Sequence, residues 1–233
     1  MSAERLAVLR DVAARIARLR LKHPLRVAVD GRTAAGKTTW SDELAASIRD
    51  LGKPVIRTSI DGFHRPKIER YARGRYSAEG YYHDARDLAA IVTLLLDPLG
   101  PGGNRQYRSA SFDLETDQPI AQEPQLAPHD AVLIVDGTFL QRPELRDSWD
   151  LTIFLKTSAD VAERRAVARD AALQGGADAA RALYAQRYGA AFALYDDMCG
   201  PEEIADVVLD NDDFRHPTLL IREDSLLAAP DLR

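Results

Sequence analysis

The chain has only one cysteine, Cys199, and no long hydrophobic run among its 233 residues. A single cysteine excludes an internal disulfide, which favours a reducing compartment. The most apolar runs have only the length of a strand, so we expect no membrane partner and a soluble, cytoplasmic protein. The formal net charge of -5 argues against nucleic acid as a partner, because general binding of nucleic acid needs an excess of lysine and arginine.

The chain does contain apolar strands that alternate with helices. Near-continuous apolar runs predict strands at residues 25–30, 54–60, 131–137, 151–157 and 205–211. The intervening segments predict helices at residues 38–52, 84–96 and 158–173. Asp84 and Ser158 are the expected N-caps, and Gly175-Gly176 separates the third helix from another that runs to about Met198. This alternation is typical of an α/β protein with a doubly wound, parallel sheet.

The length suits one domain, which we expect to cover residues 1–233. Within residues 1–22, Leu9 and Ile16 belong to an apolar stripe at helical spacing, which predicts an amphipathic helix packed on the domain. The alternative is a targeting or membrane-surface segment, and the acidic residues Glu4 and Asp11 count against it.

A phosphate-binding loop is the clearest motif. The stretch GRTAAGKT, residues 31–38, matches G-x-x-x-x-G-K-[ST] between a strand and a helix. Such a loop folds around a phosphate with its N–H groups inward, and Lys37 would reach the β- and γ-phosphates of ATP or another nucleoside triphosphate. The alternative is a glycine turn without a ligand. The predicted nucleotide-binding residues are Gly31, Thr33, Ala34, Ala35, Gly36, Lys37, Thr38 and Thr39.

Carboxylates follow two of the predicted strands. Parallel strands end at the same edge of a sheet, so Asp61 and Asp136 should both face the nucleotide cleft. Asp136 and the Thr38 hydroxyl would hold Mg²⁺. Asp61 would orient the hydroxyl of an acceptor and accept its proton as the general base, and it is also a candidate Mg²⁺ ligand. Both aspartates precede glycine and could instead be ordinary turn residues.

Four further features bear on the transfer. Arg165 and Arg169 share one helical face and would neutralise charge on the transferring phosphoryl group, which makes Arg169 a candidate catalytic residue, unless this face is simply solvated. A helical lid, at about residues 170–200, would close to exclude water. His64 either contacts the acceptor or lies on the loop. The basic loop 64–75 either receives an acceptor that bears a phosphate or carboxylate, or keeps a mobile loop soluble.

In their order along the chain, these motifs resemble the uridine kinase/phosphoribulokinase family of P-loop kinases. The resemblance spans residues 25–211, and its segments are GRTAAGKT, SIDGFHR, GYYHDARDL, NRQYRSASFD, VLIVDGTFL, RRAVARD and ADVVLDN. It implies a three-layer P-loop NTPase fold with a central, mostly parallel sheet and a helical lid. It also implies that Asp61 activates the acceptor, that residues 62–83 and Tyr107 line the acceptor site, and that Arg165 and Arg169 reach the nucleotide phosphates.

We therefore expect a kinase that transfers the γ-phosphoryl group of ATP to a small-molecule alcohol, most simply a nucleoside such as uridine or cytidine. The predicted acceptor-binding residues are Asp61, His64, Tyr76, Tyr82 and Tyr107. Two alternatives stay open: another alcohol, such as a sugar phosphate or pantothenate, and a nucleotide-binding switch or NTPase without an acceptor. A homo-oligomer is also left open.

Overall fold

The fold is built on a six-stranded sheet with the strand order β10-β9-β8-β1-β7-β2. The computed structural model describes residues 2–228, so the ends of the predicted domain, residues 1 and 229–233, lie outside the described residues. The strands are β1 (Leu25–Asp30), β2 (Val55–Ser59), β7 (Val132–Asp136), β8 (Leu151–Lys156), β9 (Val207–Asp210) and β10 (Thr218–Ile221). All neighbours pair in parallel except β10, which runs antiparallel to β9. The mostly parallel α/β sheet predicted from the sequence is confirmed.

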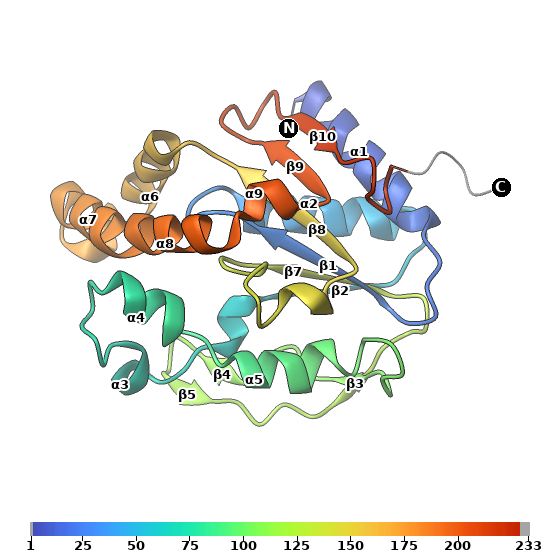
Figure 1. Cartoon of the computed structure of the whole chain (residues 1–233), viewed down its shortest axis with the longest axis horizontal. Helices are drawn as coiled ribbons and strands as arrows, with labels where there is room; N and C mark the ends of the chain where they lie inside the picture. The colour runs from blue at the N-terminus through green and yellow to red at the C-terminus, as the bar shows by residue number, and fades with distance from the viewer. Residues whose placement is uncertain (1, 229–233) are drawn as a thin grey trace.

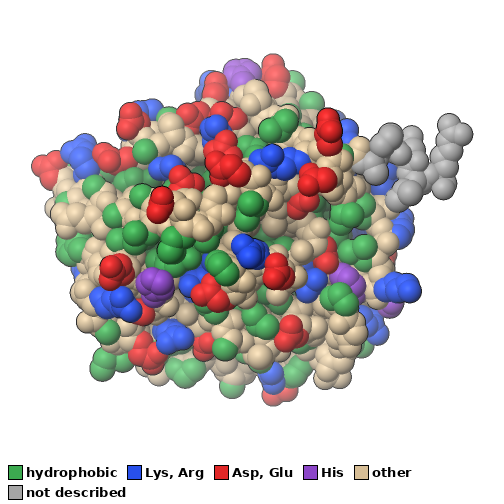
Figure 2. Space-filling view, in the orientation of Figure 1, with side chains coloured by type: hydrophobic (Ala, Val, Ile, Leu, Met, Phe, Trp, Pro, Cys, Tyr) green, Lys and Arg blue, Asp and Glu red, His purple; other side chains and the backbone are tan. Residues whose placement is uncertain are grey.

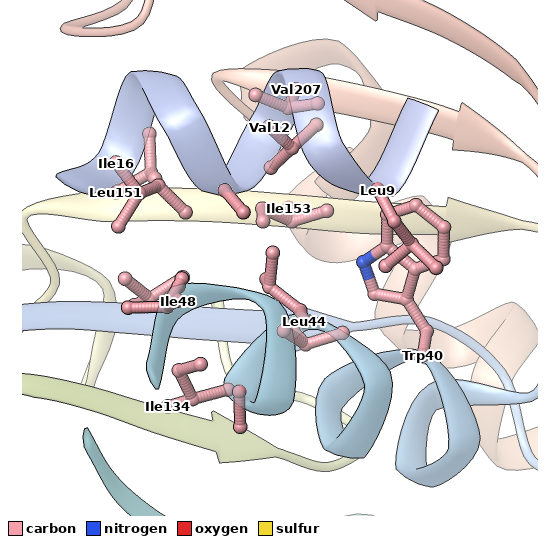
Figure 3. Packing of buried hydrophobic residues seen from close by; sticks show 14 of the residues in the cluster. Leu9, Val12, Ile16, Trp40, Leu44, Ile48, Ile134, Leu151, Ile153 and Val207 are labelled. Atoms are coloured by element: carbon pink, nitrogen blue, oxygen red, sulfur yellow. The ribbon is translucent and has the colours of Figure 1, made fainter. Parts of the chain in front are cut away.

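Helices cover both faces of this sheet and make three layers (Figure 1). On one face, α1 (Ala3–Arg18) and α2 (Lys37–Asp50) pack together against β1, β7, β8 and β9. Figure 3 shows Leu9, Val12 and Ile16 of α1 pointing toward the strand that carries Ile153. The other face packs on α5 (Leu88–Ile91) and the π-helical turn η2 (Val92–Leu96). The central strands β1 and β7 are buried on both sides because helices cover both faces.

The chain between β2 and β7 is more structured than a polar loop. It holds the 3₁₀ turn η1 (Ile60–Phe63) and the short helices α3 (Lys67–Arg70) and α4 (Ala78–His83). Two small antiparallel pairs follow, β3 (Gln106–Tyr107) with β6 (Gln125–Leu126), and β4 (Phe112–Asp113) with β5 (Gln118–Pro119). The N-cap prediction for Asp84 is wrong: Asp84 ends α4, and the Asp87 carboxylate caps α5 by accepting from the Ala90 N–H at 3.0 Å.

The segment after β8 is helical almost throughout. It comprises α6 (Ala159–Gln174), α7 (Ala177–Leu183), the π-helical turn η4 (Tyr184–Gly189) and α8 (Ala190–Cys199), followed by α9 (Pro201–Ile204). Ser158 does sit at the N-cap of α6, although its side chain makes no capping hydrogen bond. Gly175 ends α6 with φ +84, a left-handed conformation that glycine adopts without strain. The α6–α8 segment stands at one end of the sheet, near α3 and α4 (Figure 1).

The surface carries charges of both signs. On the face shown in Figure 2, arginine and lysine side chains are interspersed with aspartate and glutamate, and no broad field of one sign appears there.

A 3₁₀ turn, η3 (Arg146–Ser148), lies in the connection from β7 to β8. Across residues 2–228, no helix is at once long and apolar enough to span a bilayer.

Candidate active site

A cavity of about 670 Å³ opens where the parallel strands end. The register places Asp136 of β7 opposite both Val29 of β1 and Ser59 of β2, so the segments that follow these strands leave the sheet at one edge. The predicted site residues that line the cavity are Thr33, Ala34, Gly36, Lys37, Thr38, Thr39, Asp61, His64, Asp136, Arg165 and Arg169. The fold thus brings together side chains from the loop after β1, the turn after β2, the end of β7 and helix α6.

The loop between β1 and α2 is shaped to leave backbone N–H groups open. Gly36 has φ +93 and precedes α2, whose N-terminus has no side-chain cap. The first N–H groups of a helix without a cap are available to an anion. Gly31 and Ala35, both predicted to bind nucleotide, are not among the lining residues. They act behind the loop: a Cβ on Gly31 would lie 2.6 Å from the Leu155 carbonyl oxygen, and the Ala35 carbonyl accepts from Asn211 Nδ2 at 2.7 Å.

Lys37 is held over this loop. Its Nζ donates to the Arg32 carbonyl oxygen at 2.8 Å, and the residue is buried. Burial lowers the pKa of Lys37 from its ordinary value, although the neighbouring carboxylates of Asp30, Asp136 and Asp61 oppose that shift. A bound phosphate would add negative charge beside the ammonium group and favour its protonated form.

Asp30, the last residue of β1, is fully buried behind the loop. Its carboxylate accepts from the Gly31 N–H at 2.7 Å, from the Gln141 N–H at 3.2 Å and from the Tyr195 hydroxyl of α8. Burial raises the pKa of Asp30, and the hydrogen bond from Tyr195 is the largest opposing effect. Asp30 therefore ties the beginning of the phosphate loop to α8, a link that no local sequence pattern signals.

Thr38 and Asp136 meet as a pair of oxygen groups. The Thr38 hydroxyl donates to Asp136 Oδ2 at 2.7 Å, and Arg57 Nη1 lies 2.7 Å from Asp136 Oδ1. A hydroxyl and a carboxylate side by side are oxygen donors of the kind that Mg²⁺ takes, with phosphate and water supplying the other positions. The predicted residues fit this ion. Asp61, also predicted as a metal ligand, contacts His64 and Arg86 instead.

Asp61 lines the middle of the cavity with one oxygen engaged. Its Oδ1 accepts from Arg86 Nη2 at 2.8 Å and lies 3.2 Å from His64 Nε2, whereas its Oδ2 has no partner within residues 2–228. Enclosure in the cleft raises the pKa of Asp61, but Arg86 and His64 together outweigh it and hold the pKa well below the usual range. Asp61 is therefore an ionised carboxylate with one oxygen available to a ligand. Burial and the Arg86 charge lower the pKa of His64.

Three predicted acceptor-binding tyrosines do not line the cavity, so their role in acceptor binding stays a prediction. Tyr76 is 45% exposed on the loop before α4. Tyr82 is buried against Phe139, and the nearest hydrogen-bonding atom to its hydroxyl is Cys199 Sγ at 3.8 Å. Tyr107 donates its hydroxyl hydrogen to Gln125 Oε1 at 3.0 Å, between β3 and β6. The tyrosines that do line the cavity are Tyr71, Tyr81 and Tyr188.

Sequence reasoning missed two buried arginines of the cavity, Arg86 and Arg187. Arg86 follows α4, and Arg187 lies in η4 with its guanidinium 5.0 Å from the ring centre of Tyr71 and 4.8 Å from that of Tyr81. The one local signal is an aromatic neighbour at helical spacing, since Tyr184 precedes Arg187 by three residues. Such a signal does not separate an arginine in a site from one that merely stacks on a ring.

The two predicted lid arginines both reach the cavity from α6. Arg165 Nη2 donates to the carbonyl oxygens of Asn211 and Asp212 at 2.9 and 3.0 Å, and Arg169 pairs with Asp170 at 2.7 Å. An adjoining cavity of about 310 Å³ shares Gly36, Thr39 and Arg165 with the first and extends toward Phe214. The two cavities together give room for a ligand larger than a phosphate group.

Comparison with known proteins gives a consistent family. Residues 27–192 match the model of the phosphoribulokinase/uridine kinase family. Uridine-cytidine kinase B of Dictyostelium discoideum is 28% identical over 155 residues, which cover 66% of this chain and 61% of that protein. The chain covers 32% and 30% of two other curated relatives that it matches.

Solved structures share the fold. A possible uridine kinase from Bacillus stearothermophilus superposes with a TM-score of 0.68 at 24% identity, covering 87% of this chain and 98% of that one. A D-glycerate 3-kinase from Cryptococcus neoformans var. grubii superposes with a TM-score of 0.56 at 14% identity, covering 84% of this chain and 90% of that one. At these identities the likeness extends to the three-layer arrangement of sheet and helices.

Proposed function

The chain belongs to the phosphoribulokinase/uridine kinase family, and from that membership we propose that it is a kinase that transfers the γ-phosphoryl group of ATP to an alcohol. The observation that carries the proposal is the convergence of three groups on one cavity: the phosphate loop, the Thr38–Asp136 oxygen pair, and the half-free carboxylate of Asp61. A nucleotide-binding switch would need the phosphate loop and the Thr38–Asp136 pair. Transfer to an acceptor also needs a carboxylate, such as that of Asp61, to orient the hydroxyl and accept its proton.

The cavity supports a division of roles. The loop N–H groups and Lys37 bind the nucleotide phosphates, and Arg165 and Arg169 face them from α6. Thr38 and Asp136 would hold Mg²⁺, which when bound would offset the negative charge of the phosphates. Asp61 Oδ2 accepts a hydrogen bond from the acceptor hydroxyl, while Arg86 fixes the carboxylate through Oδ1 at 2.8 Å. This orients the hydroxyl oxygen toward the γ-phosphorus and provides a base for its proton.

The predicted lid is part of this proposal. The segment of about residues 170–200 would move toward the phosphates on the hinge at Gly175-Gly176 and exclude water from the transfer. The left-handed backbone of Gly175, with nothing within 4 Å of a Cβ placed there, suits a hinge.

The single cysteine agrees with a cytoplasmic location.

The simplest acceptor suggested by the relatives is a nucleoside, since several of them are named as uridine or uridine-cytidine kinases. A sugar phosphate or pantothenate is the second candidate. The specific observation in its favour is the number of arginines in the cavity beyond those that face the nucleotide.

Asp61→Asn tests the proposal. Acceptor-dependent ADP release is measured with ATP and Mg²⁺ across nucleosides, pentose phosphates, pantothenate and glycerate, alongside ATP binding by titration. Asn keeps the shape but is a far poorer proton acceptor, so transfer should fall by about 10²-fold or more while ATP affinity stays within about twofold.

Asp84→Asn is the matched control, because Asp84 pairs with Arg73 and does not line the cavity. It should leave both measurements unchanged. If the rate of ADP release is the same with and without every acceptor and is unchanged in Asp61→Asn, the protein is instead an NTPase or a nucleotide-binding switch.

A further inference from the structure

Arg86 and Arg187 place two positive charges at the cavity beyond those that bind the nucleotide phosphates. Arg86 is 6% exposed and Arg187 is 4% exposed, and both side chains line the cavity. They come from two neighbouring elements: Arg86 follows α4, and Arg187 lies in η4 of the α6–α8 segment. The phosphate loop, Lys37 and the α6 arginines already supply the cations that ATP needs.

Neither guanidinium is satisfied by the protein. Nε and Nη1 of Arg86 are buried without a hydrogen-bond partner, since only Nη2 is used, toward Asp61 and the Tyr81 hydroxyl. Arg187 donates from Nη1 to the Arg75 carbonyl oxygen at 2.6 Å, and no carboxylate within residues 2–228 pairs with it. Arg86 has one counterion, Asp61, at 2.8 Å, whereas Arg187 has none among the described residues. Burying a charge without a counterion costs free energy, so such groups are normally paired.

The aromatic rings around these arginines do not replace a counterion. The Arg187 guanidinium lies over Tyr71 and Tyr81, and the Arg86 guanidinium lies 4.9 Å from the ring centre of Tyr81. Stacking on a ring holds the plane of a guanidinium but leaves its N–H groups at the edge free to donate. Both guanidinium groups thus lie beside the Tyr81 ring, at 4.9 and 4.8 Å from its centre, and all three residues line the cavity.

We infer that Arg86 and Arg187 form an anion subsite beside Asp61, and that the acceptor alcohol carries a phosphate or carboxylate that occupies it. Paired N–H donors of arginine match the oxygens of either group. Asp61 would hold the acceptor hydroxyl while this subsite holds the anionic end. The inference rests on the proposed kinase function for the reaction, but the binding of the anion can be measured without turnover.

The experiment compares acceptors with and without an anionic group: ribose 5-phosphate with ribose, glycerate with glycerol, and pantothenate with pantothenyl alcohol, in which a hydroxyl replaces the carboxylate. Binding is measured by calorimetry with ADP and Mg²⁺ filling the nucleotide site, and ADP release is measured with ATP. At least one anionic member should bind about tenfold or more tightly than its neutral partner. The phosphate and carboxylate pairs distinguish the two sources of the anion.

Arg187→Gln should remove that preference by weakening the anionic member alone, with the neutral member and ADP bound as before. Arg187→Lys should retain part of it. Arg181→Gln is the matched control, since Arg181 lies on α7, is paired with Glu163 and Asp178, and does not line the cavity.

Two outcomes would overturn the inference: no anionic member binding more tightly than its neutral partner, or Arg187→Gln weakening both members equally, as a purely structural arginine would. Failure of the kinase function looks different. Tight anion binding without any acceptor-dependent ADP release would refute the transfer and leave the subsite established.

Discussion

Deleting a single hydroxyl, in Tyr195→Phe, should destabilise the protein well beyond the usual effect of so small a change. The hydroxyl donates to Asp30, whose carboxylate is fully buried. Without that hydroxyl, the remaining donors to the carboxylate among residues 2–228 are the backbone N–H groups of Gly31 and Gln141 and, at 3.5 Å, the side-chain amide of Gln141. A hydrogen bond to a buried charged group contributes about 1.5–3 kcal/mol. For a chain of this size that corresponds to a fall in melting temperature of about 3–12 °C.

The ring itself stays in place, so no cavity is created and the loss reports the hydrogen bond. Denaturant unfolding of the wild type and the variant measures it. Tyr82→Phe is the matched control from the same aromatic cluster, because the hydrogen-bond partner of the Tyr82 hydroxyl among the described residues is Cys199 Sγ, a weak acceptor at 3.8 Å. Its free energy of unfolding should change by less than about 0.5 kcal/mol.

The loss in free energy of unfolding caused by Tyr195→Phe should also depend on pH. The Tyr195 hydroxyl lowers the pKa of Asp30, which burial raises, so the variant raises that pKa further. A carboxyl with a raised folded pKa contributes stability at low pH that is lost as the pH rises through that pKa. The deficit should therefore be larger at about pH 8 than at about pH 5. Equal losses in Tyr195→Phe and Tyr82→Phe would refute the reasoning.

The remaining predictions concern metal, backbone and pH. Asp136→Asn should raise the Mg²⁺ concentration for half-maximal activity by about 10–100-fold in a Mg²⁺ titration, whereas the exposed Asp42→Asn should not. Gly31→Ala should lower the free energy of unfolding by about 3 kcal/mol or more, since its Cβ would lie 2.6 Å from a backbone carbonyl oxygen. Gly52→Ala, with open space around the Cβ, should cost only about 1–2 kcal/mol. The lowered pKa of His64 means stability that is present above about pH 6.5 and lost as the pH falls, and His64→Gln should flatten that slope in denaturant unfolding; an unchanged slope would contradict it.

The central strands were predictable because their burial is simple. β1 and β7 are covered on both faces, so their apolar runs identify them within a residue or two. β10 was missed because it is a short edge strand whose residues are at most half-buried, and its sequence, TLLI, follows a polar stretch. Nothing local distinguishes such a segment from a loop.

The same contrast applies to the site. Asp61 and Asp136 could be placed at one sheet edge because the topology alone puts them there. The tyrosines could not be, because Tyr81 and Tyr82 are adjacent on α4 and belong to the same buried cluster, yet of the two Tyr81 alone also lines the cavity. Which one faces the ligand depends on the residue at which a six-residue helix begins, set here by the Ser77 cap. Arg86 pairs with a residue 25 positions away, which no short pattern encodes.

The π-helical turn η4 sets the rotation of everything beyond it. Each helical residue advances the side chain by about 100°, so the wider turn at Tyr184–Gly189 works as a phase adjustment between α7 and α8. With it, Arg187 faces the cavity while Tyr195, two turns later, faces Asp30. Removing one residue from η4 would bring either of these side chains out of register with its target. The number of residues in this helix therefore matters as well as their identity. Insertions and deletions should be tolerated far less well than substitutions on the exposed side of the same turns.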